Sequence, residues 1–200
     1  MNTIWKSTGK AAASLRMAVL LSLSAALGLG LAACGSSSKP PAASPVTVHL
    51  YTNILTGKMI VHSGSPKYSP ANMTVPAHST VVLTIYNWDD GTAPLPSSSP
   101  YGAVTGGSET VNGSSVTSVP TANLSHTFTI PSLKINVPVP PAPTAASGSP
   151  KEPAVVVFTF HVGGSGSYTW HCMTPCGTAP GGMGGAMATP GFMEGTLTVA

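Results

Sequence analysis

The residues best suited to chemistry gather near the end of the chain, between Trp170 and Glu194. Both cysteines of the C-terminal half, Cys172 and Cys176, lie there. Four of the eight methionines follow the first of them: Met173, Met183, Met187 and Met193. A glycine-rich segment such as this one is a poor place to hide methionine for packing alone. Thiolate, thioether and imidazole together are ligands that suit copper, so the segment favours a copper site.

An inward-facing imidazole is available from the stretch 125–130, which alternates as a strand does. His126 shares one face with Phe128 and Ile130, while Thr127 and Thr129 lie on the other. A buried histidine needs a hydrogen-bond partner or a metal, which makes His126 a candidate ligand. The other five histidines are expected on the surface or pointing outward: His49, His62, His78, His161 and His171.

The two cysteines also allow a reading without metal. The N-terminal segment is typical of an exported protein, and in an oxidising compartment two nearby cysteines form a disulfide by default. A Cys172–Cys176 bridge spans three residues, so it requires a loop that brings the Cα atoms within about 7 Å. Copper ligation and a disulfide therefore remain alternatives for the same pair.

The first 33 residues read as an export signal. A basic stretch precedes the apolar run 17–33, which ends in Leu31-Ala-Ala-Cys34. This ending resembles a bacterial lipobox, in which the cysteine becomes the lipidated first residue. A retained transmembrane helix is the alternative, but about 17 residues is the short limit for a span. We expect a signal peptide at 1–33, lipid on Cys34, a Ser/Pro-rich tether at 34–45 and a domain at 46–200, held at the outer or periplasmic side of the cell membrane.

Charge argues against several classes of function. Only 6% of residues are charged, against about 25% in an ordinary soluble domain. The net charge of +3 comes from Lys6, Lys10 and Arg16, because the other five lysines balance the five acidic residues. No cluster of basic residues follows, so nucleic acid is not an expected partner. The chain also has no recognisable catalytic triad, carboxylate pair or phosphate-binding loop, so an enzyme is the least favoured class.

The elements that must position these residues are strands. With 22 Gly and 20 Pro, long helices are disfavoured. Alternating, β-branched stretches predict strands at 46–54, 79–88, 125–130, 154–161, 167–172 and 195–199, with weaker signals at 58–61 and 71–75. Seven or eight short strands predict an all-β sandwich, with Phe128, Phe158, Phe160 and Trp170 in its core. Two long polar loops are expected at 91–124 and 138–153, the first as a solvated excursion without chemistry.

Three segments resemble the cupredoxins, specifically the copper-binding domain of cytochrome c oxidase subunit II. They are Leu124-Ser-His-Thr-Phe-Thr-Ile-Pro-Ser-Leu-Lys-Ile-Asn136, Gly166-Ser-Tyr-Thr-Trp-His-Cys-Met-Thr-Pro-Cys-Gly177 and Glu194-Gly-Thr-Leu-Thr-Val199. Lys134 stands where that family has glycine after Pro-Ser-Leu. The resemblance is clear over roughly residues 120–200 and implies a Greek-key cupredoxin sandwich.

The resemblance also implies a ligand set. The family's pattern Cys-x-x-x-Cys-x-x-x-His-x-x-Met places its sulfur ligands on Cys172, Cys176 and Met183, beside His126. Thr174 falls on the position that supplies a backbone ligand. The family's second histidine falls on Pro180, and no histidine follows His171. His171 and Met187 are the less favoured candidates for metal ligands.

Three functions follow from these residues. The favoured one is a lipid-anchored copper protein that handles copper or electrons at the cell surface, with a redox partner such as a respiratory oxidase. With one histidine missing, the site should favour Cu(I), and a standard dinuclear centre is not expected. The alternative is a metal-free binding or structural module closed by a Cys172–Cys176 disulfide. An enzyme is the third and least favoured reading.

Overall fold

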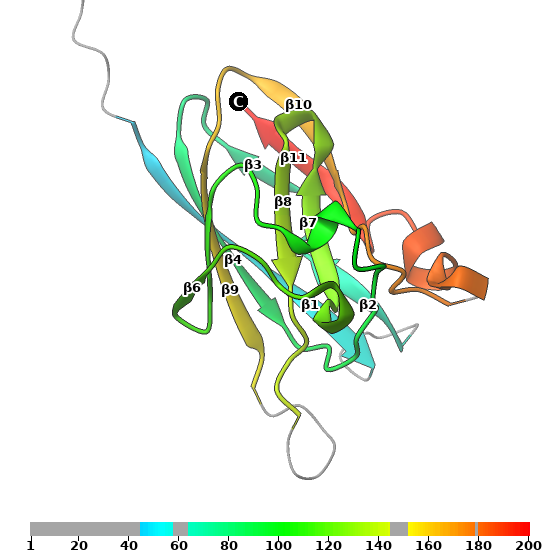
Figure 1. Cartoon of the computed structure of the whole chain (residues 1–200). Coiled ribbons are helices and arrows are strands. Elements are labelled where there is room, and N and C mark those ends of the chain that lie inside the picture. The colour runs from blue at the N-terminus through cyan, green and yellow to red at the C-terminus, as the bar shows by residue number, and fades with distance from the viewer. Residues whose placement is uncertain (1–44, 58–63, 145–151, 179) are drawn as a thin grey trace, which may run out of the picture. The chain divides into compact units, whose positions relative to one another are not determined.

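The computed structural model describes residues 45–57, 64–144, 152–178 and 180–200, and its strands form two sheets (Figure 1). The first sheet has the order β2 (Gly64–Ser69), β1 (Thr47–Gly57), β4 (Thr80–Asn87), β9 (Ala154–His161), β5 (Ser108–Val111), β6 (Ser114–Val116). The second has the order β3 (Met73–Val75), β11 (Glu194–Val199), β10 (Gly166–His171), β7 (His126–Ile130), β8 (Ile135–Val139). Neighbouring strands are mostly not consecutive in sequence, so the chain crosses between sheets repeatedly.

Side-chain alternation explains the centre of the first sheet. In β9 every second residue is buried, and β9 pairs antiparallel with β4 over eight residues. This register sets Leu83 opposite Phe158, and both side chains are fully buried. Strand β1 pairs with β4 in parallel, and β3 pairs with β11 in parallel; the other pairs are antiparallel. The buried faces of the two sheets contribute to one hydrophobic core.

Aromatic side chains fill the core next to the second sheet. Trp170 and Phe128 have ring centroids 4.9 Å apart, and Tyr68 lies edge-on to Trp170 at 4.7 Å. The Tyr68 hydroxyl donates to the Thr127 carbonyl at 3.0 Å, which satisfies its polar end. All four aromatic residues predicted for the core are buried, Phe128, Phe158, Phe160 and Trp170.

The all-β prediction is confirmed, but the strand count of seven or eight is too low. Eleven strands are present in the described residues, and every helix there is a 3₁₀ helix of three or four residues. The six strongest strand predictions correspond to β1, β4, β7, β9, β10 and β11, and the weaker one at 71–75 corresponds to β3. Strands β2, β5, β6 and β8 were not expected. None of the described helices is long and apolar enough to cross a membrane.

The segment 91–124 is mostly exposed, as expected from its composition, but it has more regular structure than a loop. It contains the 3₁₀ helices η1 (Pro100–Gly102) and η2 (Thr121–Asn123) and the hairpin of β5 and β6. Glu109, Val119 and Leu124 within it are buried. The polar composition misled because Ser and Thr in this hairpin form main-chain hydrogen bonds to each other and to β9.

Strand β7 is buried along its whole length, on both faces. The alternation correctly places His126 inside, but Thr127 and Thr129 are also covered. The Thr129 hydroxyl donates to Asn136 Oδ1 at 2.7 Å, and the Thr127 hydroxyl accepts from the Met173 main chain at 2.8 Å. Hydrogen bonding allows these hydroxyls to be buried where solvent had been expected.

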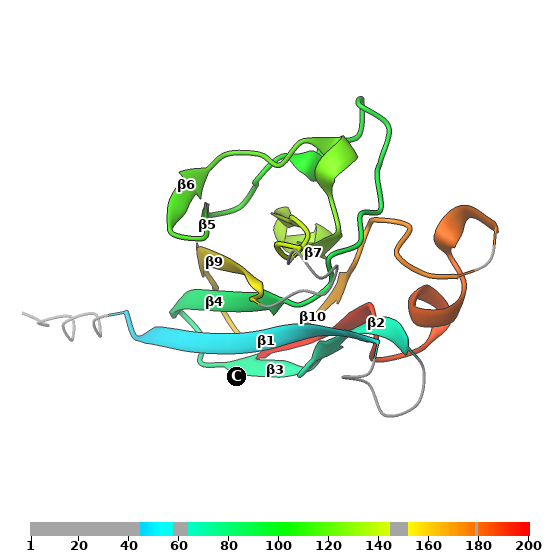
Figure 2. The ribbon, with the colours of Figure 1, turned by 90° about the horizontal axis from the view of Figure 1, so that it is seen from below.

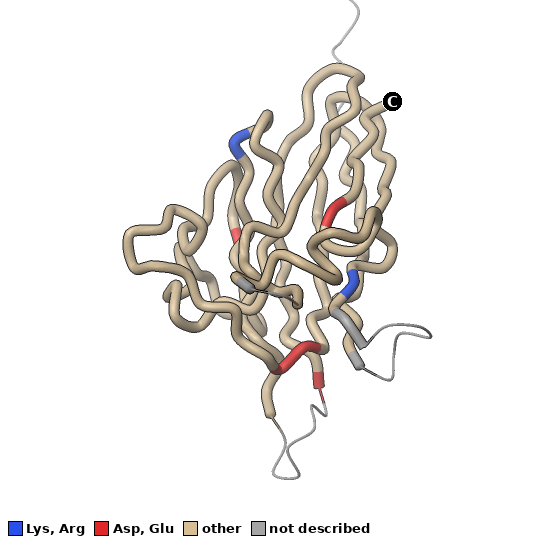
Figure 3. The backbone as a smooth tube through the Cα atoms, turned by 90° about the vertical axis from the view of Figure 1, so that its right-hand side faces the viewer, with Lys and Arg blue, Asp and Glu red and all other residues tan. Residues whose placement is uncertain are grey.

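The described chain has few charged residues, and its two lysines are well separated. Among the described residues, the only lysines or arginines are Lys67 and Lys134, and they lie far apart (Figure 3). Lys134 adopts the left-handed conformation with φ 55°, at the turn where the resembling family has glycine. The signal peptide, Cys34, the tether to residue 44, His62 and the weak strand at 58–61 lie outside the described residues.

Candidate metal centre

The ends of three strands bring the candidate ligands together. Strand β7 begins at His126, and β10, its antiparallel neighbour, ends at His171, directly before Cys172. Strand β4 of the other sheet ends at Asn87, two residues before Asp89. Strands β7 and β10 are antiparallel with His171 opposite Thr129, so the chain that continues past β10, beginning with Cys172, runs alongside the start of β7, where His126 lies. The chain after β10, coloured orange, extends beside the sheets in both views (Figure 1, Figure 2).

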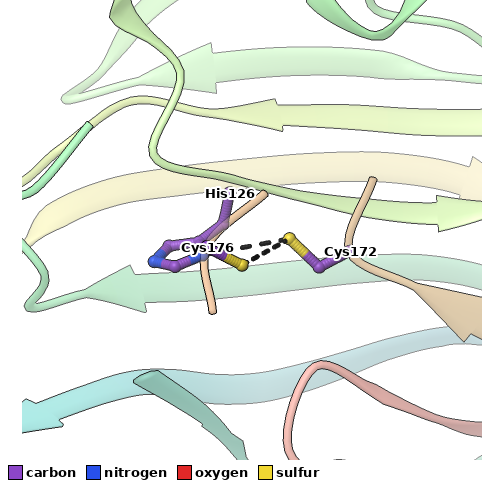
Figure 4. Close-up of side chains that lie close together, drawn as sticks. All are labelled: His126, Cys172 and Cys176. Atoms are coloured by element: carbon purple, nitrogen blue, oxygen red, sulfur yellow. Dashed lines mark hydrogen bonds between the residues drawn. The ribbon is translucent and has the colours of Figure 1, made fainter. Parts of the chain in front are cut away.

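One histidine and two cysteines form a compact cluster (Figure 4). The ligand atoms of His126, Cys172 and Cys176 all lie within 4.8 Å of one another. Cys172 Sγ is 3.3 Å from Cys176 Sγ and 3.9 Å from His126 Nδ1. Both cysteines are free thiols. His126 and Cys172 are buried, while Cys176 is partly exposed at the outer side of the cluster.

The fourth donor close to this cluster is Met187. Its Sδ lies 3.3 Å from Cys176 Sγ, and the residue belongs to the 3₁₀ helix η5 (Gly185–Ala188). Met183, which the resemblance favoured, is 60% exposed and lies outside the cluster. Of the other two methionines, Met193 is buried in the core and Met173 is half-buried. The structure thus places Met187, the less favoured candidate, beside the Cys176 thiol, and leaves the favoured Met183 exposed.

The backbone after Cys176 accounts for this difference. The N–H of Gly177 donates to the Gly182 carbonyl, and Thr178 and Gly184 exchange two main-chain hydrogen bonds. The chain therefore doubles back on itself, with Met183 at the outside of the turn and Met187 returning beside Cys176. A side chain at Gly177 would collide with the carbonyl oxygen of Gly184, so the close approach of the two segments requires glycine there.

Neighbouring polar groups point at the sulfur of Cys172. The Thr127 main-chain N–H donates to Cys172 Sγ at 3.4 Å, and the Thr174 hydroxyl lies 3.2 Å away. The single proton of that hydroxyl is donated to the Ser125 carbonyl at 2.9 Å, so toward Cys172 Sγ the hydroxyl acts as an acceptor, and the Thr127 N–H is the donor to the sulfur. The Thr174 carbonyl, expected from the resemblance as a backbone ligand, is 3.9 Å from Cys172 Sγ. Hydrogen bonds to a sulfur ligand stabilise its thiolate form.

Asp89 binds the far side of the His126 ring, a contact that the sequence analysis missed. Its Oδ2 lies 3.0 Å from His126 Nε2. Asp89 lies in the connection from β4 to β5 of the first sheet and is 37 residues from His126 in sequence, so no local pattern could link the two. The only local signal was the position of Asp89 directly after the strongest predicted strand.

The electrostatics of the cluster favour a charged pair. Burial disfavours an imidazolium, but the contacts with Asp89 and Cys172 prevail and raise the pKa of His126 to about 9. Burial likewise disfavours a thiolate at Cys172, but hydrogen bonds from Cys176 and His126 lower the pKa of its thiol. The hydrogen bond with Cys172, together with burial, raises the pKa of the Cys176 thiol. Since metal ligands must be deprotonated, metal binding here would release the protons of His126 Nδ1 and Cys176.

The four other histidines within the described residues lie away from the cluster. His171 faces the opposite way from Cys172, with Nδ1 3.4 Å from a carboxylate oxygen of Glu194 and 44% of the side chain exposed. His161 is exposed, and its Nδ1 contacts the Thr80 hydroxyl at 3.0 Å. His49 and His78 are exposed, as expected. No second imidazole joins His126 among the described residues that could hold a metal.

These donors fit copper, and they fit its reduced form best. Two thiols and one imidazole nitrogen converge, a thioether lies beside one of the thiols, and sulfur ligands of this kind select Cu(I). His126 also has a carboxylate on its second nitrogen, as metal-binding histidines usually do. The donor set is short of imidazole for a mononuclear blue site.

Comparison with known proteins gives structural similarities only. No protein-family model and no curated protein matches the sequence. The chain is similar to rusticyanin from Thiobacillus ferrooxidans at 18% identity and a TM-score of 0.32, covering 78% of this chain and 79% of that one. A second structure of the copper protein rusticyanin is 17% identical with a TM-score of 0.34, and the match covers 78% of this chain and 80% of that one. A chain of a heme-copper terminal oxidase dimer is 13% identical with a TM-score of 0.35, and the match covers 84% of this chain and 77% of that one. Because these TM-scores are low, the description of the fold rests on the strand order of this structure and not on the similarities.

Proposed function

We propose that this protein is a copper-binding cupredoxin-like protein that carries Cu(I) or passes electrons, and that it is not an enzyme. The observation that carries the proposal is the convergence of His126, Cys172 and Cys176 within 4.8 Å, with the Met187 sulfur beside them. The two-sheet fold and the three sequence segments that resemble the copper domain of oxidase subunit II support it. Bound copper would supply one-electron chemistry.

The protein's own residues would contribute in different ways. His126 and Cys172 come from the rigid ends of β7 and β10, so they provide the fixed half of the site. Cys176 and Met187 come from the chain after β10 and close the outer side. With sulfur as the main donor, Cu(I) is the favoured state, and a stable blue Cu(II) form would require His171 or His161 to turn inward.

Copper uptake by the reduced domain tests the proposal. Titration with Cu(I), without oxygen and against a chromophoric Cu(I) chelator, should show one copper per chain. His126→Ala and Cys172→Ser should each weaken binding by more than the roughly 10–100-fold typical of losing an outer-shell partner. His161→Ala, which removes an exposed imidazole away from the site, is the matched control and should change nothing.

The opposite result would favour the metal-free alternative. The two sulfur atoms lie 3.3 Å apart, so a Cys172–Cys176 disulfide is the competing state of the same residues. A disulfide has no thiolate to offer a metal. If reduced protein takes up no copper, and if both cysteines resist thiol reagents until a reductant is added, the domain is a disulfide-closed binding or structural module.

We further propose that Cys34 is lipidated and anchors the protein to the outer or periplasmic side of the cell membrane. The lipobox-like ending of the apolar run supports this location, as does a tether long enough to hold the domain clear of the lipid. Cys34→Ala, expressed behind a cleavable signal without a lipobox, should release the protein into the soluble fraction. Persistent membrane attachment would instead indicate a retained helix. A membrane oxidase is the kind of redox partner that such a location would suit.

A further inference from the structure

Both nitrogens of the buried His126 ring have a defined neighbour. Nε2 lies 3.0 Å from Asp89 Oδ2, while Nδ1 faces Cys172 Sγ at 3.9 Å. A carboxylate accepts hydrogen bonds and cannot donate them when ionised, so Nε2 must carry the proton in this contact. Nδ1 is therefore the nitrogen directed at the sulfur atoms.

Asp89 is held firmly enough to impose this choice. Its second carboxylate oxygen, Oδ1, accepts from the Gly91 main-chain N–H at 2.9 Å. Its own main-chain N–H donates to Asn87 Oδ1 at 3.0 Å, and its carbonyl accepts from the Ala142 N–H at 2.8 Å. The Asn87 amide in turn donates to the Pro140 carbonyl at 2.8 Å. These bonds tie Asp89 to the end of β4 and to the chain after β8.

The two oxygens of Asp89 act as acceptors for two different donors, the His126 ring and the Gly91 main chain. An amide has one acceptor oxygen and one donor nitrogen, so asparagine at this position would lose one of the two bonds. In one orientation, the asparagine NH₂ group would face the Gly91 N–H, and two donors would oppose each other. In the other orientation, the NH₂ group would face His126 Nε2. The second arrangement removes the proton from Nε2 and places it on Nδ1, which then cannot bind a metal.

We propose that Asp89 is a positioning residue of the copper centre: it fixes the His126 ring and keeps the proton on Nε2, so that Nδ1 is the ligand atom. The proposal rests on the proposed function, because Nδ1 has a metal to bind only if the cluster binds copper. Asp89 acts through His126 and is not itself a ligand. Outer-shell carboxylates of this kind commonly change metal affinity by about 10–100-fold.

The test combines affinity with a direct view of the ring. Asp89→Asn should weaken Cu(I) binding about 10–100-fold, whereas Asp90→Asn, which removes the same charge one residue further on, should leave it unchanged. In ¹⁵N NMR spectra of the wild-type Cu(I) protein, Nε2 of His126 should keep its proton and Nδ1 should carry the metal. The copper-free wild type should show the same Nε2 proton in slow exchange, and Asp89→Ala, which leaves Nε2 without its acceptor, should lose it.

Each outcome decides one question. Metal on Nε2 in the wild type, or equal copper affinity and equal ring signals in the Asp89 and Asp90 variants, would overturn the role of Asp89 while leaving copper binding intact. Because the wild type alone reports the bound nitrogen, this result does not depend on whether the Asp89 variants fold. If the wild type binds no Cu(I), the proposed function fails, and the Nε2 proton of the copper-free protein still decides whether Asp89 orients the ring.

Discussion

Two methionines four residues apart differ in what they can do for the site. Met187 Sδ lies 3.3 Å from Cys176 Sγ, whereas Met183 is 60% exposed on the outside of the turn. The family-like spacing pointed to Met183, because spacing counts residues and takes no account of how the chain folds back after Gly177. The thioether that can bind a metal with the thiols is thus the one nearer in space.

Replacing each methionine with leucine should separate the two. Leucine keeps the volume and apolar character of the side chain, so the fold should be retained. Met187→Leu should weaken Cu(I) binding by on the order of tenfold, as expected for a weak thioether ligand, and Met183→Leu should have no effect. Affinities are measured by competition with a Cu(I) chelator. The reverse order of effects would show that the loop rearranges around the metal and brings Met183 inward.

At the scale of elements, the short strand β5 carries an unusual buried group. Glu109 is 3% exposed, and neither of its carboxyl oxygens has a hydrogen-bond partner. Its cross-strand neighbours are Phe158 on β9 and Val116 on β6, so it faces the apolar interior. Burial raises the pKa of Glu109 to about 8, from an ordinary value of 4.5. A carboxyl group without partners is thereby kept protonated in the folded chain at neutral pH.

This raised pKa predicts a pH dependence of stability. As the pH rises from about 4.5 to about 8, the unfolded chain releases the Glu109 proton while the folded chain retains it. Ionisation therefore favours the unfolded state, and the unfolding free energy should fall by up to about 1.4 kcal/mol per pH unit across this window. Above the folded-state pKa the loss levels off. Urea unfolding at several pH values measures it.

Glu109→Gln supplies the comparison for that measurement. Glutamine is neutral at every pH and close in shape to a protonated glutamate, so the two proteins should be similarly stable near pH 5. By pH 8 the variant should be the more stable one. Because other groups titrate equally in both proteins, the difference between the curves isolates Glu109. Parallel curves would mean that the carboxyl group finds a partner or reaches solvent.

Elements were predictable from the sequence where alternation was strong. Strands β4 and β9 are long and β-branched, and they bury alternate residues as their patterns indicate. The short strands β5 and β6 are rich in Ser and Thr, and β8 contains Pro138, so their patterns resemble loops. What makes them strands is pairing with distant partners, and this pairing has no local signature.

Across the whole molecule, residues on or near strands could be predicted from the sequence, whereas residues in turns and connections could not. His126, Cys172 and Cys176 were predicted because each lies on or next to a recognisable strand. Asp89 and Met187 reach the site through turns and connections whose course depends on long-range contacts. The sequence thus predicted His126, Cys172 and Cys176, and the structure was needed to find Asp89 beside the His126 ring and Met187 beside Cys176.

We expect a single copper ion to bind among His126, Cys172, Cys176 and Met187. X-ray absorption at the copper edge, on the reduced domain loaded with one equivalent of Cu(I), tests it most directly. We expect an edge typical of Cu(I), a first shell dominated by sulfur with one nitrogen, and loss of a sulfur contribution in Met187→Leu. A short copper–copper vector would instead indicate a dinuclear centre. A shell of nitrogen and oxygen alone would show that copper binds elsewhere, and either result would contradict the assignment.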